Sequence, residues 1–351
     1  MYITENDLLR KNNNFGALRH LATLTVFISH TYGISGIGYE PLGLLTGNRY
    51  VLSAFGLNLF FCMSGFLVCH SLITSPSIKQ YLLNRFLRIW PAYAVNVLFC
   101  ILFIGIPFTT LPVLDFLSNP QTRFFLLKNI SLIGSTFTLP GVINNEAINS
   151  SAWTIPVEFR LYFVLLLMYL VFKLRFNQMM LLLLITLWLA QLVIPVSWQH
   201  AAFKPHVLYS INLGLHFLTG ACFYLYKDSI PLKLSIWFIL FACWLAIHIW
   251  LPAYWARTEQ PFWTYTIMWM AFRWYRVPFM KTDISYGVYL YAIPIQLIIL
   301  LTIGQSFSFP VFLLFSLVCT VALALLSWYL IEKKALSLKM FFKNKQPAKA
   351  L

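Results

Sequence analysis

The chain has 351 residues, of which 60% are hydrophobic and only 10% are charged. Soluble proteins carry about 25% charged residues, so this composition excludes a soluble globular protein and indicates an all-α polytopic membrane protein. The formal net charge of +15 does not indicate nucleic-acid binding, because the basic residues form short clusters between apolar runs.

Ten apolar stretches, each close to the roughly 20 residues that a helix needs to cross a bilayer, predict about ten transmembrane helices. In chain order they are Phe15–Ile34, Tyr50–Ile73, Ile89–Pro107, Trp153–Phe172, Met179–Val196, His206–Tyr226, Leu234–Leu251, Phe262–Phe279, Ile284–Ile303 and Pro310–Ile331. We expect one membrane-embedded domain over residues 1–340 and a short basic cytoplasmic tail over residues 341–351.

Alternate connections are basic, which predicts that both termini lie in the cytoplasm of a protein of the cell (inner) membrane. The basic connections hold Arg10 and Lys11; Lys79, Arg85 and Arg88; Lys173 and Arg175; Lys227 and Lys233; Arg273, Arg276 and Lys281; and the tail from Lys333 to Lys349. The other connections are poorer in Lys and Arg and include Glu40, Asp115, Glu146 and Glu259.

The stretch Arg123–Leu139 complicates this topology. It is apolar but contains Lys128 and Asn129, and a crossing here would place every later basic loop outside. We therefore interpret it as re-entrant, or as lying on the outer interface, within a long exoplasmic loop from Phe108 to Ala152.

The first span carries Arg19 and His30, and ionisable side chains at membrane depth are costly. They are eleven residues apart, which places them on one helix face and roughly 16 Å apart along the axis. One face would then present a cation at one depth and a titratable imidazole at another. The alternative is that Arg19 extends to the interface and His30 caps the helix.

Ser64 and Gly65 interrupt the apolar second span. Gly65 allows another helix or a ligand to approach the backbone. Ser64 has a hydroxyl that can bond a substrate, or it bonds back to its own helix.

Arg85 and Arg88 lie one turn apart before the third span, at the predicted cytoplasmic surface. Two arginines at this spacing are suited to phosphate groups. The alternative is ordinary anchoring of the helix end, with Trp90 in the interface.

Glu158 lies about one turn into the fourth span from its outer end, where a carboxylate needs a partner or a use. Arg160 and Arg19 are possible ion-pair partners. Pro156 permits a local break that would aim Glu158 inward. Because His30 also ends near the outer face, the sequence predicts an imidazole and a carboxylate at the same depth, as a histidine base requires.

In the ninth span Tyr286 and Tyr289 share a face, with Asp283 at its cytoplasmic end. Aromatic packing, and capping of the helix by Asp283 or Ser285, is the alternative to a functional role. The other histidines and the six cysteines show no metal-ligand spacing, so we expect no metal, no disulfide framework and no bound cofactor.

Taken together and in order, these stretches resemble acyltransferase family 3. The elements that carry the resemblance are Arg19 with His30, then Phe60, Phe61, Ser64, Gly65, Phe66 and Leu67, then Arg85, Arg88, Ile89 and Pro91, then Trp153, Thr154, Glu158 and Tyr162, and last Ser285, Tyr286, Tyr289 and Leu290. The chain departs from the family at Gly16, where relatives often have Asp, and at Ala292, where many have His.

The resemblance implies a membrane O-acyltransferase that moves an acyl group, usually acetyl, from acyl-coenzyme A to a sugar hydroxyl. The acceptor would be a surface polysaccharide, lipopolysaccharide or lipid-linked glycan. His30 would be the general base, oriented or charged by Glu158, while Arg19 would stabilise the thioester carbonyl. Donor or substrate contacts would come from Ser64, Arg85, Arg88, Trp153 and Tyr286. The alternatives are a transporter or flippase for an acyl or glycolipid species, and a membrane scaffold without chemistry.

Overall fold

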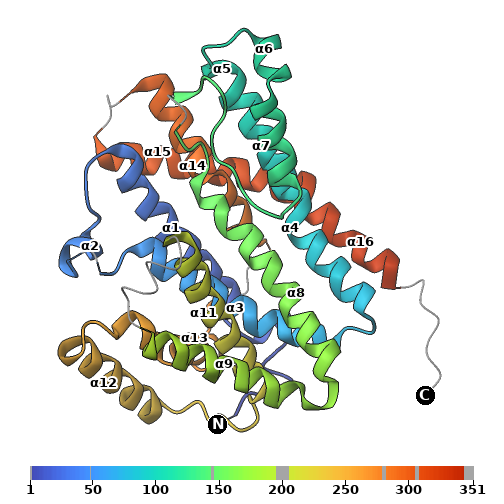
Figure 1. Ribbon diagram of the computed structural model, residues 1–351, viewed down its shortest axis with the longest axis vertical. Coiled ribbons are helices and arrows are strands. Elements are labelled where there is room, and N and C mark those ends of the chain that lie inside the picture. Colours follow the sequence, from blue (N-terminus) through green and yellow to red (C-terminus); the bar gives the residue numbers. More distant parts are fainter. Residues whose placement is uncertain are drawn as a thin grey trace. The chain divides into compact units, whose positions relative to one another are not determined.

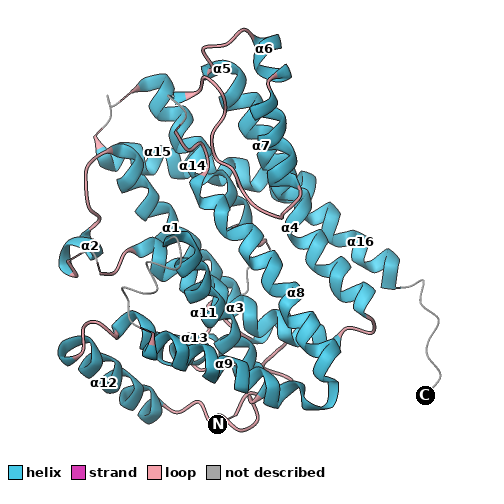
Figure 2. Ribbon diagram, viewed as in Figure 1, coloured by secondary structure: helices cyan, strands magenta, loops and turns pink. Residues whose placement is uncertain are grey.

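The computed structural model describes residues 2–47, 49–143, 146–194, 205–278, 282–304 and 308–343. In these residues the regular structure is helical, which confirms the all-α prediction (Figure 2). Six helical stretches in them are long and apolar enough to cross a membrane. They are Leu52–Thr74, Ile78–Phe108, Ser150–Val193, His206–Leu225, Ser285–Ile303 and Phe309–Lys339. The structure therefore supports an integral membrane protein, whereas the count of ten transmembrane helices stays a prediction.

The chain divides into two compact units, and each is described by itself. The first comprises Met1–Ala22, Phe55–Thr74 and Leu161–Lys281. The second comprises Thr23–Ala54, Ser75–Arg160 and Thr282–Leu351. The single domain expected over residues 1–340 remains a prediction.

The first unit is built from helices that pack closely through small residues. It holds the start of α1 (Phe15–Ser35), most of α3 (Leu52–Thr74), the end of α8 (Thr154–Phe172), and the helices α9 (Phe176–Val193), α11 (Pro205–Leu225), α12 (Leu234–Trp250) and α13 (Trp255–Phe272). A Cβ atom added to Gly65 of α3 would lie 1.9 Å from the Phe217 carbonyl oxygen, and one added to Gly220 would lie 2.1 Å from the Cys62 carbonyl oxygen. Only glycine permits this approach of α3 and α11.

The second unit contains the rest of α1 and the helices that surround α14 (Ser285–Ile303). Its other helices are α2 (Pro41–Leu45), α4 (Ile78–Cys100), α5 (Ile106–Phe108), α6 (Val113–Ser118), α7 (Pro120–Ile130), the first residues of α8, α15 (Phe309–Ser327) and α16 (Lys333–Lys343). A π-helical turn, Ile101–Gly105, joins α4 to α5, and another, Trp328–Glu332, joins α15 to α16. Figure 1 shows α4 and α16 running side by side, in agreement with their packing contacts.

Two helices begin well before their predicted spans. The helix predicted from Ile89 begins at Ile78, where the Ser77 side chain accepts a hydrogen bond from the Gln80 backbone N–H. The helix predicted from Phe262 begins at Trp255. Hydropathy locates only the apolar part of such helices, and buried polar partners inside the protein stabilise the remaining turns. The predicted ends at Val196 and Phe279, the basic Lys281, and residues 344–351 of the predicted tail lie outside the described residues.

Hydrogen bonds to α14 fix the directions of its neighbours. Thr23 of α1 bonds the Ser285 carbonyl and Thr31 accepts from Gln296, so α1 runs parallel to α14. Arg88 of α4 pairs with Asp283, just before α14, and Asn96 bonds the Leu290 carbonyl, so α4 is parallel too. These directions match the predicted alternation, in which the first, third and ninth spans all leave the cytoplasm.

The segment Arg123–Leu139 does not form one continuous helix. The helix α7 has 11 residues and ends at Ile130, so it is too short to cross a bilayer alone. In the chain beyond it, Leu139, Val142 and Ile148 are fully inaccessible, whereas Ile133 is 80% exposed. This segment leads into a 3₁₀ turn, Ser150–Trp153, from which α8 begins.

Candidate functional site

Helix α1 is unbroken from Phe15 to Ser35 and so carries Arg19 and His30 on one face, as predicted. Both side chains are partly exposed. Within the described part of the chain the His30 imidazole makes no hydrogen bond, which leaves both ring nitrogens open to a ligand. His20, by contrast, hydrogen-bonds the Gly16 carbonyl of its own helix.

Arg88 of α4 is held at the start of α14. Its Nη2 lies 3.1 Å from Asp283 Oδ2, and its guanidinium lies 6.0 Å from the centre of the Tyr286 ring. The Tyr286 hydroxyl donates to the Ile89 carbonyl at 3.0 Å. Asp283 also accepts from Ser285, and the N-cap residue Ile284 makes no side-chain cap. Whether Asp283 or Ser285 caps this helix stays open.

Glu332 joins this cluster from the π-helical turn after α15. Its side chain is buried, accepts a hydrogen bond from Ser327 at 3.4 Å, and lies close enough to Arg88 and Asp283 to interact with them electrostatically. The sequence analysis does not single out Glu332. The sequence feature that could have indicated it is a single acidic residue at the end of the last apolar run, directly before the basic tail.

Glu158 of α8 lies near α14 in the second unit. It is close enough to Tyr286 and Tyr289 to interact with both electrostatically. That His30 and Glu158 share one depth stays a prediction.

The start of α8 contacts α14. Thr154 bonds the Tyr289 hydroxyl of α14, and Glu158 lies one turn further along α8. Arg160 is not its partner, because Arg160 is exposed and bonds the Pro156 carbonyl. Trp153, half-buried, is the last residue of the 3₁₀ turn.

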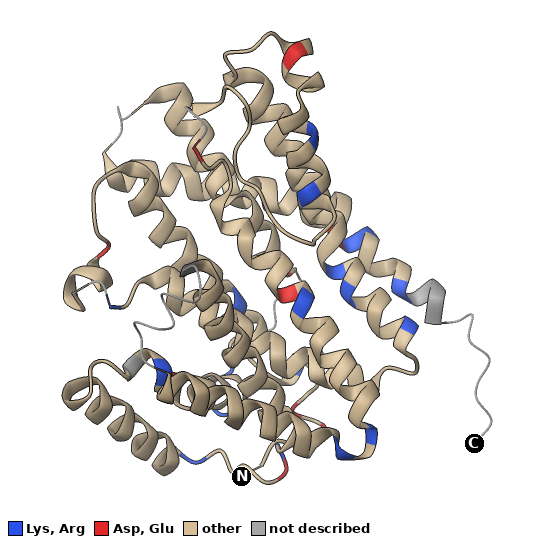
Figure 3. Cartoon of the chain, viewed as in Figure 1, with Lys and Arg blue, Asp and Glu red and all other residues tan. Residues whose placement is uncertain are grey.

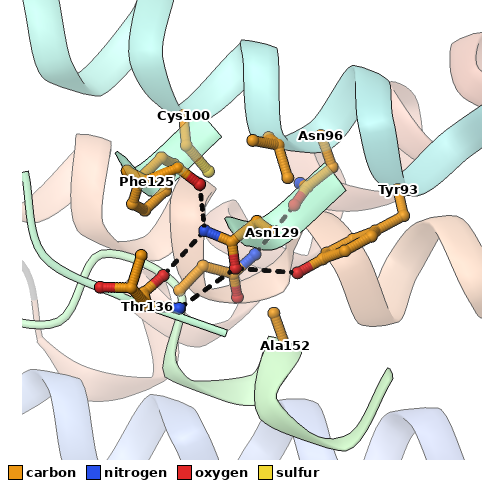
Figure 4. Close-up of a pocket in the computed structure, with 9 residues that line it drawn as sticks. Tyr93, Asn96, Cys100, Phe125, Asn129, Thr136 and Ala152 are labelled. Atoms are coloured by element: carbon orange, nitrogen blue, oxygen red, sulfur yellow. Dashed lines mark hydrogen bonds between the residues drawn. The ribbon is translucent and has the colours of Figure 1, made fainter. Parts of the chain in front are cut away.

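A buried polar network holds the segment before α8 in place (Figure 4). Asn149 donates to the Asn96 side chain at 3.0 Å and to the Leu290 carbonyl at 3.1 Å, and accepts from Ser151 at 2.8 Å. Nearby, Asn129 accepts from the Tyr93 hydroxyl at 3.1 Å. The cavity between these side chains measures ≈ 10 Å³, room for no more than one water molecule. This network is therefore structural, not a substrate pocket.

In the first unit, Ser64 of α3 lies 3.4 Å from the Tyr162 hydroxyl of α8. The structure thus joins two of the predicted elements there. The neighbouring Gly65 is covered by the backbone of α11, so its small size serves helix packing and leaves no space for a ligand.

A second buried cluster in the first unit was missed by the sequence analysis. His216, treated as a packing residue, lies with its Nε2 3.9 Å from Glu259 Oε1, and Asn58 donates to the same carboxylate at 3.2 Å. Glu259, predicted in an outer connection, is buried inside α13. All three side chains are almost fully inaccessible, so they fix helices α3, α11 and α13 together.

Comparison with known proteins identifies the chemistry. The chain is similar to the O-acetyl transferase of Shigella phage Sf6, with 29% identity over 350 residues that cover 94% of this chain and 97% of the relative. It is also similar to nodulation protein 10 of Rhizobium leguminosarum bv. viciae, with 26% identity over 361 residues, 93% of this chain and 94% of the relative. No solved structure matches the chain. The profile of the acyltransferase domain matches residues 12–329, so the chain belongs to acyltransferase family 3, whose members transfer acyl groups.

Proposed function

We propose that this membrane acyltransferase moves an acetyl group from acetyl-coenzyme A to a sugar hydroxyl of a surface polysaccharide, lipopolysaccharide or lipid-linked glycan. The relative named as an O-acetyl transferase, which matches along nearly all of its length, supports an acetyl group and an oxygen acceptor. The observation that carries the proposal is that a chain of this family keeps Arg19 and His30 on one face of the uninterrupted α1.

His30 would act as the general base. Its imidazole takes the proton of the acceptor hydroxyl while the oxygen attacks the thioester carbonyl. The C–O bond forms, the C–S bond breaks, and the departing thiolate takes the proton from the imidazolium. Arg19, on the same helix face, would stabilise the negative charge that develops on the carbonyl oxygen, with Ser64 as a further donor.

The donor phosphates would be held by Arg85 and Arg88. Arg88 is fixed by Asp283 and by the Tyr286 ring, so its guanidinium is already ordered before a ligand arrives. Glu158, which interacts electrostatically with Tyr286, would orient or charge His30. Trp153 would contact the substrate from the start of α8.

In the proposed topology both termini face the cytoplasm, where acetyl-coenzyme A is made available. The polyanionic nucleotide stays near the arginines, because the free energy of moving its charges into hydrocarbon is prohibitively high. The thin pantetheine arm spans the remaining distance towards His30, and the acceptor glycan approaches from the opposite face.

The direct test is transfer by the purified protein. Reconstituted protein is given acetyl-coenzyme A with a labelled acetyl group and an envelope glycan extract, and labelled, base-labile ester on the glycan is measured. A transporter or flippase would move glycolipid across vesicles without forming this ester, and a scaffold would tolerate neutral replacement of His30 without loss of function. Either result contradicts the proposal.

A further inference from the structure

The last helix of the described chain, α16, brings further positive charge to Arg85 and Arg88. It packs along α4, and Figure 3 shows Lys and Arg positions gathered where the two helices run together. This helix begins at Lys333, just after residues 12–329 that match the family.

Lys339 lies on the face of α16 that meets α4. Glu332 and Ala335 are buried, and residues at positions i, i+3 and i+7 share one face of a helix, which places Lys339 in line with them. Lys339 is close enough to Arg85 and Arg88 to repel both electrostatically. In the described residues its ammonium group makes no hydrogen bond or ion pair, and its charged neighbours are these two arginines.

Lys339 adds a third positive charge beside Arg85 and Arg88, and like charges at this range repel one another. The carboxylates of the cluster lie deeper: the side chain of Asp283 is 5% exposed against 25% for Arg88, and Glu332 is buried. An anion arriving from solvent therefore meets the cations first. Lys333 and Lys334, by contrast, are exposed.

We propose that Lys339 completes, with Arg85 and Arg88, a three-cation site for the phosphate groups of the coenzyme A donor. This inference rests on the proposed function, because it names an additional binding residue for the same donor. An ammonium group suits the role, since it acts as a compact point charge beside the two planar guanidinium groups. The same phosphate chemistry occurs in anionic lipid headgroups, so the test must separate the two sources.

Binding is measured with the purified full-length protein and coenzyme A, which has no acyl group to transfer. We expect Lys339→Gln to weaken coenzyme A binding about fivefold to tenfold, and Lys339→Arg to keep most of the affinity. The matched control is Lys334→Gln, an exposed lysine on another face of the same helix, which should bind as the unchanged protein does. Pantetheine, which lacks the phosphates, should bind equally to all variants.

The outcomes separate this inference from the proposed function. If Arg85→Gln weakens coenzyme A binding and Lys339→Gln does not, the three-cation site is wrong and the donor site stands. If neither replacement changes the affinity in folded protein, the donor site itself is wrong. If Lys339→Gln instead reduces co-purified phosphatidylglycerol, with coenzyme A binding unchanged, the ligand of Lys339 is a lipid and the inference is overturned.

Discussion

His30 differs from three other histidines of the described chain in the partners of its ring. The rings of His20, His70 and His216 each hydrogen-bond a protein group, whereas that of His30 bonds nothing in the described residues. A histidine without a protein partner, on a face shared with an arginine, is free to bond an acceptor hydroxyl. Such a residue is expected to contribute to the rate and little to stability.

We therefore predict that His30→Ala lowers the transfer rate by about 10²–10⁴ while the protein folds and inserts normally. Transfer is measured with labelled acetyl-coenzyme A in reconstituted vesicles. His20→Ala, on the same helix, is the matched control and should keep near-normal activity. Near-normal transfer by folded His30→Ala protein would contradict the catalytic role.

Gly65 provides a prediction about stability. Its added Cβ would meet backbone atoms of Phe217, which cannot rotate away, so α3 and α11 would have to separate. Gly65→Ala should lower the free energy of unfolding by about 1–3 kcal/mol, measured by thermal denaturation in detergent. Gly16→Ala is the control, because nothing lies within 4 Å of a Cβ there. An unchanged melting temperature for Gly65→Ala would show that the two helices are not in close contact.

At the scale of elements, sequence reasoning located most helices and placed several of their ends incorrectly. The helix α1 agrees within one residue of the predicted Phe15–Ile34, because its boundaries coincide with the change in hydropathy. The start of α4 was missed by eleven residues, because Gln80 and Tyr81 are polar in sequence but buried in the fold. Tertiary burial of polar side chains is not visible in a hydropathy pattern.

The candidate site shows the same limit. Of the residues predicted for the site, Arg88 and Tyr286 lie close together. The pairing of His30 with Glu158 stays a prediction, because the sequence lets depth be counted only from the end of an apolar run. Some residues of the loop before α8, such as Leu139 and Ile148, are fully buried. Nothing in the composition of the loop reveals which residues these are.

That loop gives a prediction at this scale. Asn149 makes three side-chain hydrogen bonds, to Asn96, Leu290 and Ser151, and all are buried. Asn149→Ala should destabilise the protein by about 1–3 kcal/mol, since it leaves buried partners unsatisfied. It should also lower kcat, because the start of α8 that carries Glu158 loses its anchor. Asn177→Ala, at an exposed asparagine of α9, is the control. Wild-type stability and kcat in Asn149→Ala would show that the network does not position α8.

At the scale of the whole molecule, the charge pattern predicts an orientation that helix directions alone do not fix. Parallel α1, α4 and α14 agree with alternation of the predicted spans, but inversion of the entire chain would keep the same directions. Sidedness therefore depends on the positive-inside argument: Lys173 and Arg175 in the turn between α8 and α9 should lie in the cytoplasm. The loop after α7 should lie outside.

Two single cysteines test this orientation. Ile133, 80% exposed, lies in the predicted exoplasmic loop, and Leu174, fully exposed, lies in the basic turn. The background needs Cys243 and Cys319 replaced by Ser, because these two are accessible while the other four cysteines are buried. In intact cells, Ile133→Cys should react with a membrane-impermeant maleimide, and Leu174→Cys should react only after lysis. Labelling of Leu174→Cys from outside, with Ile133→Cys protected until lysis, would invert the topology. Arg85, Arg88 and Lys339 would then face the exoplasm, where no coenzyme A is available, and the assignment of these residues to the donor would fail with it.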